Sequence, residues 1–253
     1  MTSHRTTLRA GPGVLAAVLL WCAPAAAQPA AGDALFGRPI ALVVALALVA
    51  LLPFAFMSVT AFVKISTVLQ IVRGAIGAAN VPSNTVVMAL AAVLTLLAMA
   101  PVGSRIADRV VPLWTPQTVN DTTELVRGLV EAVREPMRDF LRANASDREK
   151  KRFFDVARAA RPIEERAAVN PNDLVVVIPA FVVTELLEAF ALGFALYLPL
   201  LIIDLVVGNV LLALGMQMMN PTQVSLPFKL LLFVAIDGWG LLAQSLVIGY
   251  RVG

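Results

Sequence analysis

The sequence has little of the side-chain chemistry on which most enzymes rely. Its 253 residues include a single cysteine, Cys22, and a single histidine, His4, and both lie close to the N-terminus. If that region is removed, the mature chain can form no disulfide, no cysteine or histidine metal site and no histidine-based catalytic triad. We therefore expect no enzyme activity, no metal and no cofactor.

Charge is also scarce, and it is unevenly distributed. Charged residues make up 15% of the chain, whereas an ordinary soluble domain has about 25%. Residues 103–172 hold 13 basic and 11 acidic side chains, so the formal net charge of +3 does not come from a basic stripe. Because nucleic-acid binding needs clustered cations, this class of partner is excluded.

Apolar side chains make up most of the remainder. The chain is 59% hydrophobic and its mean hydropathy is +0.82, while soluble domains are about 45–50% apolar. A soluble fold of this composition could not cover its own surface. We predict an all-α membrane protein, built from helical hairpins with a polar helical middle segment.

Residues 1–27 have the features of a cleavable secretory signal. Arg5 and Arg9 provide a positive start, a short apolar stretch follows, and three alanines precede Gln28. The apolar stretch is shorter than the roughly 20 residues needed to span a bilayer. We expect cleavage rather than an uncleaved anchor, which leaves residues 28–39 as a short mature N-terminal segment outside the cytoplasm.

Residues 40–102 are predicted to form the first hydrophobic hairpin. The uncharged run from Ile40 to Val63 would measure about 36 Å as a helix, with a kink at Pro53. A second apolar helix is expected over 85–100, starting at the Pro-Ser-Asn sequence that precedes it. Lys64 and Arg73 lie in the connection, which the positive-inside rule places in the cytoplasm.

The polar segment 103–172 should then lie on the far side of the membrane from the cytoplasm. Apolar residues three and four apart predict two amphipathic helices, over 126–140 and 147–160. The sequence Asn-Ala-Ser at 144–146 separates them, and Pro162 ends the second. The abundant charge indicates a solvated surface.

Residues 173–253 are predicted to form a second helical hairpin, which descends over 174–214 and returns over 226–250. Isolated charges interrupt this apolar region, although each costs about 2.5–3.5 kcal/mol on a lipid-facing helix. These charged residues are Glu185, Glu188, Asp204, Lys229 and Asp237. At the tip, three of four consecutive residues are methionine: Met216, Met218 and Met219.

The carboxylates allow several interpretations. Glu185 and Glu188 project from one helix face, as in a di-iron or proton-relay site, but di-iron bundles also need histidine. Asp204 and Asp237 could belong to an intramembrane aspartyl protease, although the sequence around Asp237 lacks the expected pattern. The simplest interpretation is that these charges pair with one another, with Lys229 or with neighbouring subunits, and are buried against protein.

The methionines also allow two interpretations. Methionine is flexible and polarizable, so ordinary core packing explains most clusters. Their position at an uncharged turn favours a more specific role, because turns are seldom the densest part of a core.

Several motifs resemble the FliP/SctR (YscR/HrcR) family of flagellar and type III secretion export-apparatus proteins. Upstream matches are Phe62-Val63-Lys64-Ile65, Arg73 to Gly77, Pro82-Ser83-Asn84, Ala100-Pro101-Val102 and Pro136 to Leu141. The more specific matches are Pro179-Ala180-Phe181, Thr184-Glu185-Leu186, Ala189-Phe190, Gly193-Phe194, Pro199, Ile203-Asp204, Leu214-Gly215-Met216, Ser225 to Lys229, Leu232-Phe233 and Asp237-Gly238-Trp239. The resemblance covers most of residues 55–250.

The resemblance implies a non-enzymatic pore subunit that passes unfolded protein substrates across the membrane. It further implies a homopentamer, joined by two small hydrophobic subunits of the FliQ/SctS and FliR/SctT kinds and by further export-gate proteins. The isolated charges would then be satisfied at subunit interfaces, and the proline-broken helices would be buried in protein or line a cavity.

The resemblance assigns Met216, Met218 and Met219 to a gasket that narrows the closed pore, because soft side chains can seal and still deform. Gln217 interrupts what is usually a continuous methionine run, and Leu187 stands where a basic residue often lies. The long leader is typical of the flagellar branch and the middle segment of the injectisome branch. The alternative function is a proton-coupled small-solute transporter subunit using Glu185, Asp204 and Asp237.

Overall fold

The computed structural model describes residues 39–78, 81–113 and 122–251. These residues form α-helices, short 3₁₀ helices and turns without any strand, which confirms the predicted all-α fold. The chain divides into two units, residues 1–51 and 52–253, and the arrangement described below is that of the second. The expected signal at 1–27 and nearly all of the expected segment 28–39 lie outside the described residues.

The first apolar run is divided between two helices. α3 covers Pro39–Val59 and contains Pro53, while α4 covers Phe62–Ile76. The sequence predicted one helix as far as residue 63. Instead, the Thr60 hydroxyl donates a hydrogen bond of 2.7 Å to the Phe56 carbonyl and accepts one from the backbone amide of Phe62. Such hydroxyl contacts compete with the helical hydrogen-bond ladder, which explains a break at Thr60 rather than at the proline.

α5 covers Asn84–Val110 and leads into a 3₁₀ turn, η2, at Val111–Leu113. The predicted helix start is confirmed, because the Ser83 hydroxyl caps the helix by accepting a hydrogen bond from the Val86 amide. The helix runs ten residues beyond the predicted end at 100, because the charged residues that follow end the apolar run but not the helix.

The predicted pair of amphipathic helices is confirmed in the middle segment. α7 covers Thr122–Asn144, α8 covers Asp147–Ala159, and a 3₁₀ helix, η3, covers Ile163–Ala168. Ser146 caps α8 by accepting a hydrogen bond from the Glu149 amide. A hydrogen bond from Lys150, together with its positive charge, holds the pKa of the Asp147 carboxyl below its usual range.

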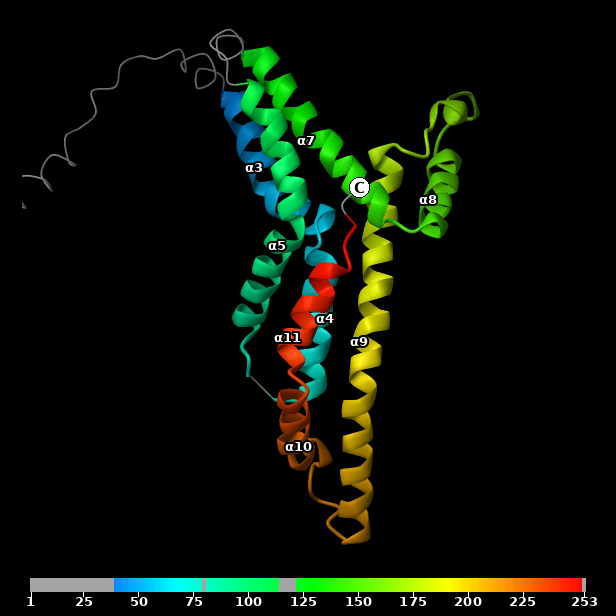
Figure 1. Ribbon diagram of the computed structural model, residues 1–253. Coiled ribbons are helices and arrows are strands. Elements are labelled where there is room, and N and C mark those ends of the chain that lie inside the picture. Colours follow the sequence, from blue (N-terminus) through cyan, green and yellow to red (C-terminus); the bar gives the residue numbers. More distant parts are fainter. Residues whose placement is uncertain (1–38, 79–80, 114–121, 252–253) are drawn as a thin grey trace, which may run out of the picture. The chain divides into compact units, whose positions relative to one another are not determined.

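The predicted C-terminal hairpin is also confirmed (Figure 1). α9 covers Leu174–Ala213, and the return limb consists of α10, Pro221–Ala235, and α11, Gly238–Ile248. The return limb bends by 57° between its two helices. Asp237 adopts a left-handed conformation there (φ 51°). The next residue is Gly238. A larger residue would not fit there, because an added Cβ would lie 2.5 Å from the Phe233 ring.

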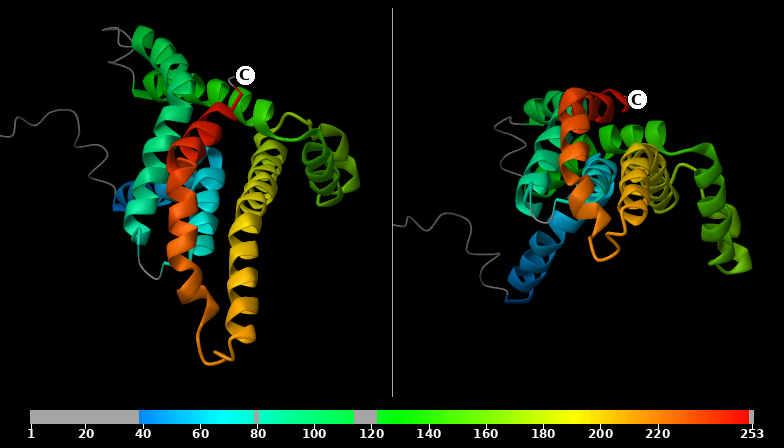
Figure 2. Two further views of the ribbon diagram at one scale, coloured as in Figure 1. Left: turned by 60° about the horizontal axis from the view of Figure 1, so that its bottom comes forward. Right: turned by 90° about the horizontal axis from the view of Figure 1, so that it is seen from below.

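α4 packs between α5 and α9 and forms the centre of the main hydrophobic core (Figure 2). Its closest approach to α9 occurs at Gly193, where an added Cβ would lie only 2.5 Å from Ile71. A second core joins α7 to the first turns of α9 around Phe140 and Phe181, whose ring centroids are 5.7 Å apart. The polar middle segment is thereby fixed to the hairpin.

Two of the described helices, α5 with its 3₁₀ extension and α9, are long and apolar enough to cross a membrane, and up to four spans are possible if each bent pair counts as one. α9 has 40 residues, about 60 Å at 1.5 Å per residue. The hydrocarbon core of a bilayer is about 30 Å thick. About half of α9 must therefore lie outside the hydrocarbon core if the helix crosses upright.

Candidate functional site

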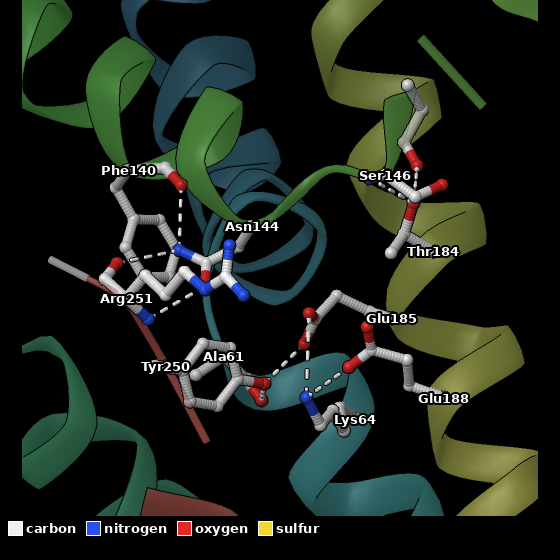
Figure 3. A network of polar contacts seen from close by, with 11 residues as sticks. Ala61, Lys64, Phe140, Asn144, Ser146, Thr184, Glu185, Glu188, Tyr250 and Arg251 are labelled. Carbon is white, nitrogen blue, oxygen red and sulfur yellow. Dashed lines mark hydrogen bonds and ion pairs between the residues drawn. The ribbon is translucent and has the colours of Figure 1, made fainter. Parts of the chain in front are cut away.

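The first polar cluster joins α4 to α9 (Figure 3). Lys64 lies on the first turn of α4, and its Nζ is 2.6 Å from a carboxylate oxygen of Glu188 and 3.9 Å from one of Glu185. The Glu185 side chain is 1% exposed, whereas that of Glu188 is 51% exposed. One lysine therefore faces two carboxylates, of which Glu185 is buried and Glu188 is exposed.

The end of the chain completes this cluster. The Tyr250 hydroxyl contacts the Glu185 carboxylate and lies 3.2 Å from the Ala61 carbonyl oxygen. Lys64 Nζ is 4.7 Å from the centre of the Tyr250 ring, which is close enough for a cation–π contact. The side-chain amide of Asn144 bonds the backbone N–H and C=O of Arg251, both at 2.9 Å. These contacts hold the C-terminal segment against α4, α7 and α9.

Replacing Tyr250 with phenylalanine should destabilise the folded chain by about 1–3 kcal/mol, because a buried carboxylate loses a hydrogen-bond donor. The only other tyrosine, Tyr197, makes no side-chain hydrogen bond with the described residues. Tyr197→Phe is therefore a matched control that should change stability little. Unfolding by SDS titration in mixed micelles, followed by circular dichroism, measures both; equal effects of the two substitutions would contradict the role given to Tyr250.

The second polar cluster lies nearer the tip of the hairpin. Lys229 of α10 is 2% exposed, and its Nζ lies 2.6 Å from Asp204 of α9 and 3.0 Å from the Ala75 carbonyl oxygen of α4. The Ser225 hydroxyl also contacts the Asp204 carboxylate. Lys229 therefore joins three helices, and it occupies the C-terminal end of α4, where a positive charge is favourable.

The remaining candidates are exposed in the isolated chain. Asp237 lies at the bend of the return limb, and its carboxylate makes no ion pair within the described part of the chain. Met218 is fully exposed, and Met216 and Met219 are each almost half exposed. They lie with Gln217 in the loop between α9 and α10, at the opposite end of α9 from the first cluster (Figure 1).

The structure therefore separates the candidate residues into four places: the first cluster, the second cluster, the bend and the methionine loop. It brings Lys229 together with Asp204, a pairing that the sequence included among its possibilities. Sequence reasoning missed Lys64, Tyr250 and Ser225 as members of these clusters. An isolated lysine directly after a 24-residue uncharged run was the available signal, because such a charge needs a partner.

Known proteins with similar sequences identify the family. The model of the FliP family matches residues 45–246, which is most of the chain and includes the second polar cluster and the Lys64, Glu185 and Glu188 side chains of the first. The chain belongs to the FliP family. This result confirms the resemblance identified in the sequence motifs. Tyr250 and Arg251, which complete the first cluster, lie beyond the range that the FliP family matches.

Individual relatives of this FliP-family chain support the same assignment. The hypersensitivity response secretion protein HrcR of Ralstonia nicotianae is 42% identical over 210 residues, which are 83% of this chain and 96% of the relative. The Yop proteins translocation protein R of Yersinia pestis is 39% identical over 211 residues, covering 83% and 96%. The virulence protein YscR of Salmonella typhimurium is 36% identical over 209 residues, covering 83% and 95%.

Proposed function

We propose that this FliP-family chain is a structural, non-enzymatic pore subunit of a type III protein export apparatus in the bacterial inner membrane. It passes unfolded protein substrates across that membrane. The observation that carries this proposal is α9: an apolar helix about 60 Å long exceeds the hydrocarbon core twofold. The apolar surface beyond the bilayer needs a protein cover, and the names of the relatives as secretion and translocation proteins support an assembly of this kind.

The exposed apolar residues of the hairpin indicate where sibling subunits would pack. Along α9 they include Phe190, Phe194, Ile202 and Leu205, each more than half exposed. The proposed assembly is a homopentamer with two small hydrophobic export subunits and further export-gate proteins. The charged α7 and α8 then lie on the periplasmic side.

The methionine loop is the proposed gate. Met216, Met218 and Met219 lie at the tip of a hairpin whose two limbs are fixed by Lys229 and Asp204. A firmly held base and a soft, exposed tip suit a constriction that must seal and then deform around a passing chain.

Native mass spectrometry of the complex purified from its own host tests the assembly. The expected result is five copies of this chain together with two small hydrophobic proteins. Cells that lack the chain should lose type III secretion and regain it on complementation. A monomer or dimer that transports a small solute would overturn the proposal.

The structure does not favour the transporter alternative. Glu185 and Asp204 are 19 residues apart on α9, which corresponds to about 28 Å along the helix. Each carboxylate already contacts a buried lysine. A proton relay would require closely spaced carboxylates that can exchange protons.

A further inference from the structure

A polar cavity lies beside the first cluster. Its volume is about 430 Å³, and it is formed by the turn between α7 and α8, the middle of α9, the start of α4 and the C-terminal segment. Seven charged side chains line it. They are the cations Lys64, Arg142, Lys150 and Arg251 and the carboxylates Asp147, Glu185 and Glu188.

Two of these cations have no acidic partner within the described residues. Lys64 pairs with the glutamates, and Lys150 Nζ lies 2.8 Å from Asp147. Arg142 and Arg251 form no ion pair with the described part of the chain, and both are exposed residues that line the cavity. Four cations and three carboxylates give the lining a net charge of +1, and the two guanidinium groups are its cations without an acidic partner among the described residues. Guanidinium groups bind phosphate oxygens in a bidentate manner.

An apolar cavity of about 380 Å³ continues the same seam between α9 and the return limb. Leu192, Ala195 and Leu196 of α9 face Leu241 and Leu242 of α11 across it. This volume lies in the range of small-molecule pockets, about 300–1,000 Å³.

The two cavities share three lining elements: α4, α9 and the C-terminal limb. Residues four or eight apart lie on the same side of a helix. On each shared element, one residue of such a pair lines the polar cavity and the other lines the apolar cavity. The pairs are Glu188 and Leu192 of α9, Gly249 and Ser245 of the C-terminal limb, and Lys64 and Val72 of α4. The two cavities therefore lie next to each other along the groove between α9 and α11, with charged residues at one end and aliphatic residues at the other.

We propose that this groove binds an anionic phospholipid, with its phosphate at Arg142 and Arg251 and an acyl chain along Leu192, Ala195 and Leu241. The separation of charge and apolar surface along one groove matches the two halves of such a lipid. The site requires only a membrane environment and does not depend on the proposed role in protein export.

Native mass spectrometry of the full chain in detergent tests the site with short-chain phosphatidylglycerol. Arg142→Gln combined with Arg251→Gln should weaken binding by about tenfold or more, because two charge-assisted contacts are lost. Arg134→Gln is the matched control, since Arg134 is exposed on α7 and does not line the cavity. Equal binding by the double variant and the control would overturn the proposal.

Two further comparisons separate a lipid from other occupants. Ala195→Trp should fill the aliphatic end and weaken binding of phosphatidylglycerol, whereas Leu198→Trp, outside the groove, should not. Glycerol phosphate that competes as well as the whole lipid would show a simple anion site and overturn the proposal. A photo-crosslinker at Ala195 should capture lipid in native membranes, and a protein adduct instead would also overturn it.

Discussion

Replacing Lys229 with methionine is expected to destabilise the chain by about 3–5 kcal/mol, because removing one member of a buried ion pair leaves the other without its partner. Lys229 is 2% exposed and contacts both the Asp204 carboxylate and the Ala75 carbonyl oxygen. Methionine fills a similar volume but cannot donate to either oxygen. The midpoint of SDS-induced unfolding, followed by circular dichroism, gives the change.

A paired substitution distinguishes a charge effect from a packing effect. Removing both charges, as Lys229→Met with Asp204→Leu, should restore much of the lost stability, because no unpaired charge then remains. Lys151→Met is the surface control: Lys151 is exposed on α8 and its loss should change stability by less than about 0.5 kcal/mol. If the double variant is as unstable as the single one, packing rather than charge pairing explains the effect.

The helices that sequence reasoning located well are those with local signals. Ser83 and Ser146 cap α5 and α8 with their own side chains, and an N-cap is visible from neighbouring residues alone. Asn220 caps α10 in the same way, but the return limb was expected to start only at 226. The return limb was predicted without its break. Asp237 is left-handed and Gly238 touches the Phe233 ring, and that conformation becomes apparent only once the packing of the bend is known.

The membership of the polar clusters could not be predicted in the same way. In the sequence, Glu185 lies 121 residues after Lys64 and 65 residues before Tyr250. Their pairing depends on the register with which α4 and the C-terminal segment pack on α9. That register is set by contacts such as Ile71 against Gly193. The sequence showed that isolated charges needed partners but did not specify which ones.

The methionine loop illustrates the opposite case, because the sequence singled it out while the isolated chain leaves it exposed. Three methionines in four residues are conspicuous, yet Met218 is fully exposed and the hydrogen bonds of the loop among the described residues are local backbone bonds. Its role as a seal would arise only when several copies bring their tips together. It therefore stays a prediction that a test of permeability can decide.

Deleting Met216 to Met219 is expected to make membranes that contain the assembled apparatus leak ions and small molecules, by on the order of tenfold or more. An apolar constriction blocks ions because water leaves a narrow hydrophobic passage, and its removal leaves a wet opening. The triple serine variant at Met216, Met218 and Met219 keeps the loop length and should leak as well, since it removes the apolar surface without shortening the hairpin. Met57→Ser is the control, because Met57 is similarly exposed but lies on α3.

The measurement is dye or ion efflux from cells or vesicles that carry each variant, with secretion assayed in parallel. The Asp204–Lys229 pair fixes the base of the loop, so the serine variant should still assemble, and its leak can be attributed to the lost seal rather than to a misfolded hairpin. Unchanged permeability with continued secretion would show that Met216, Met218 and Met219 do not form the gate.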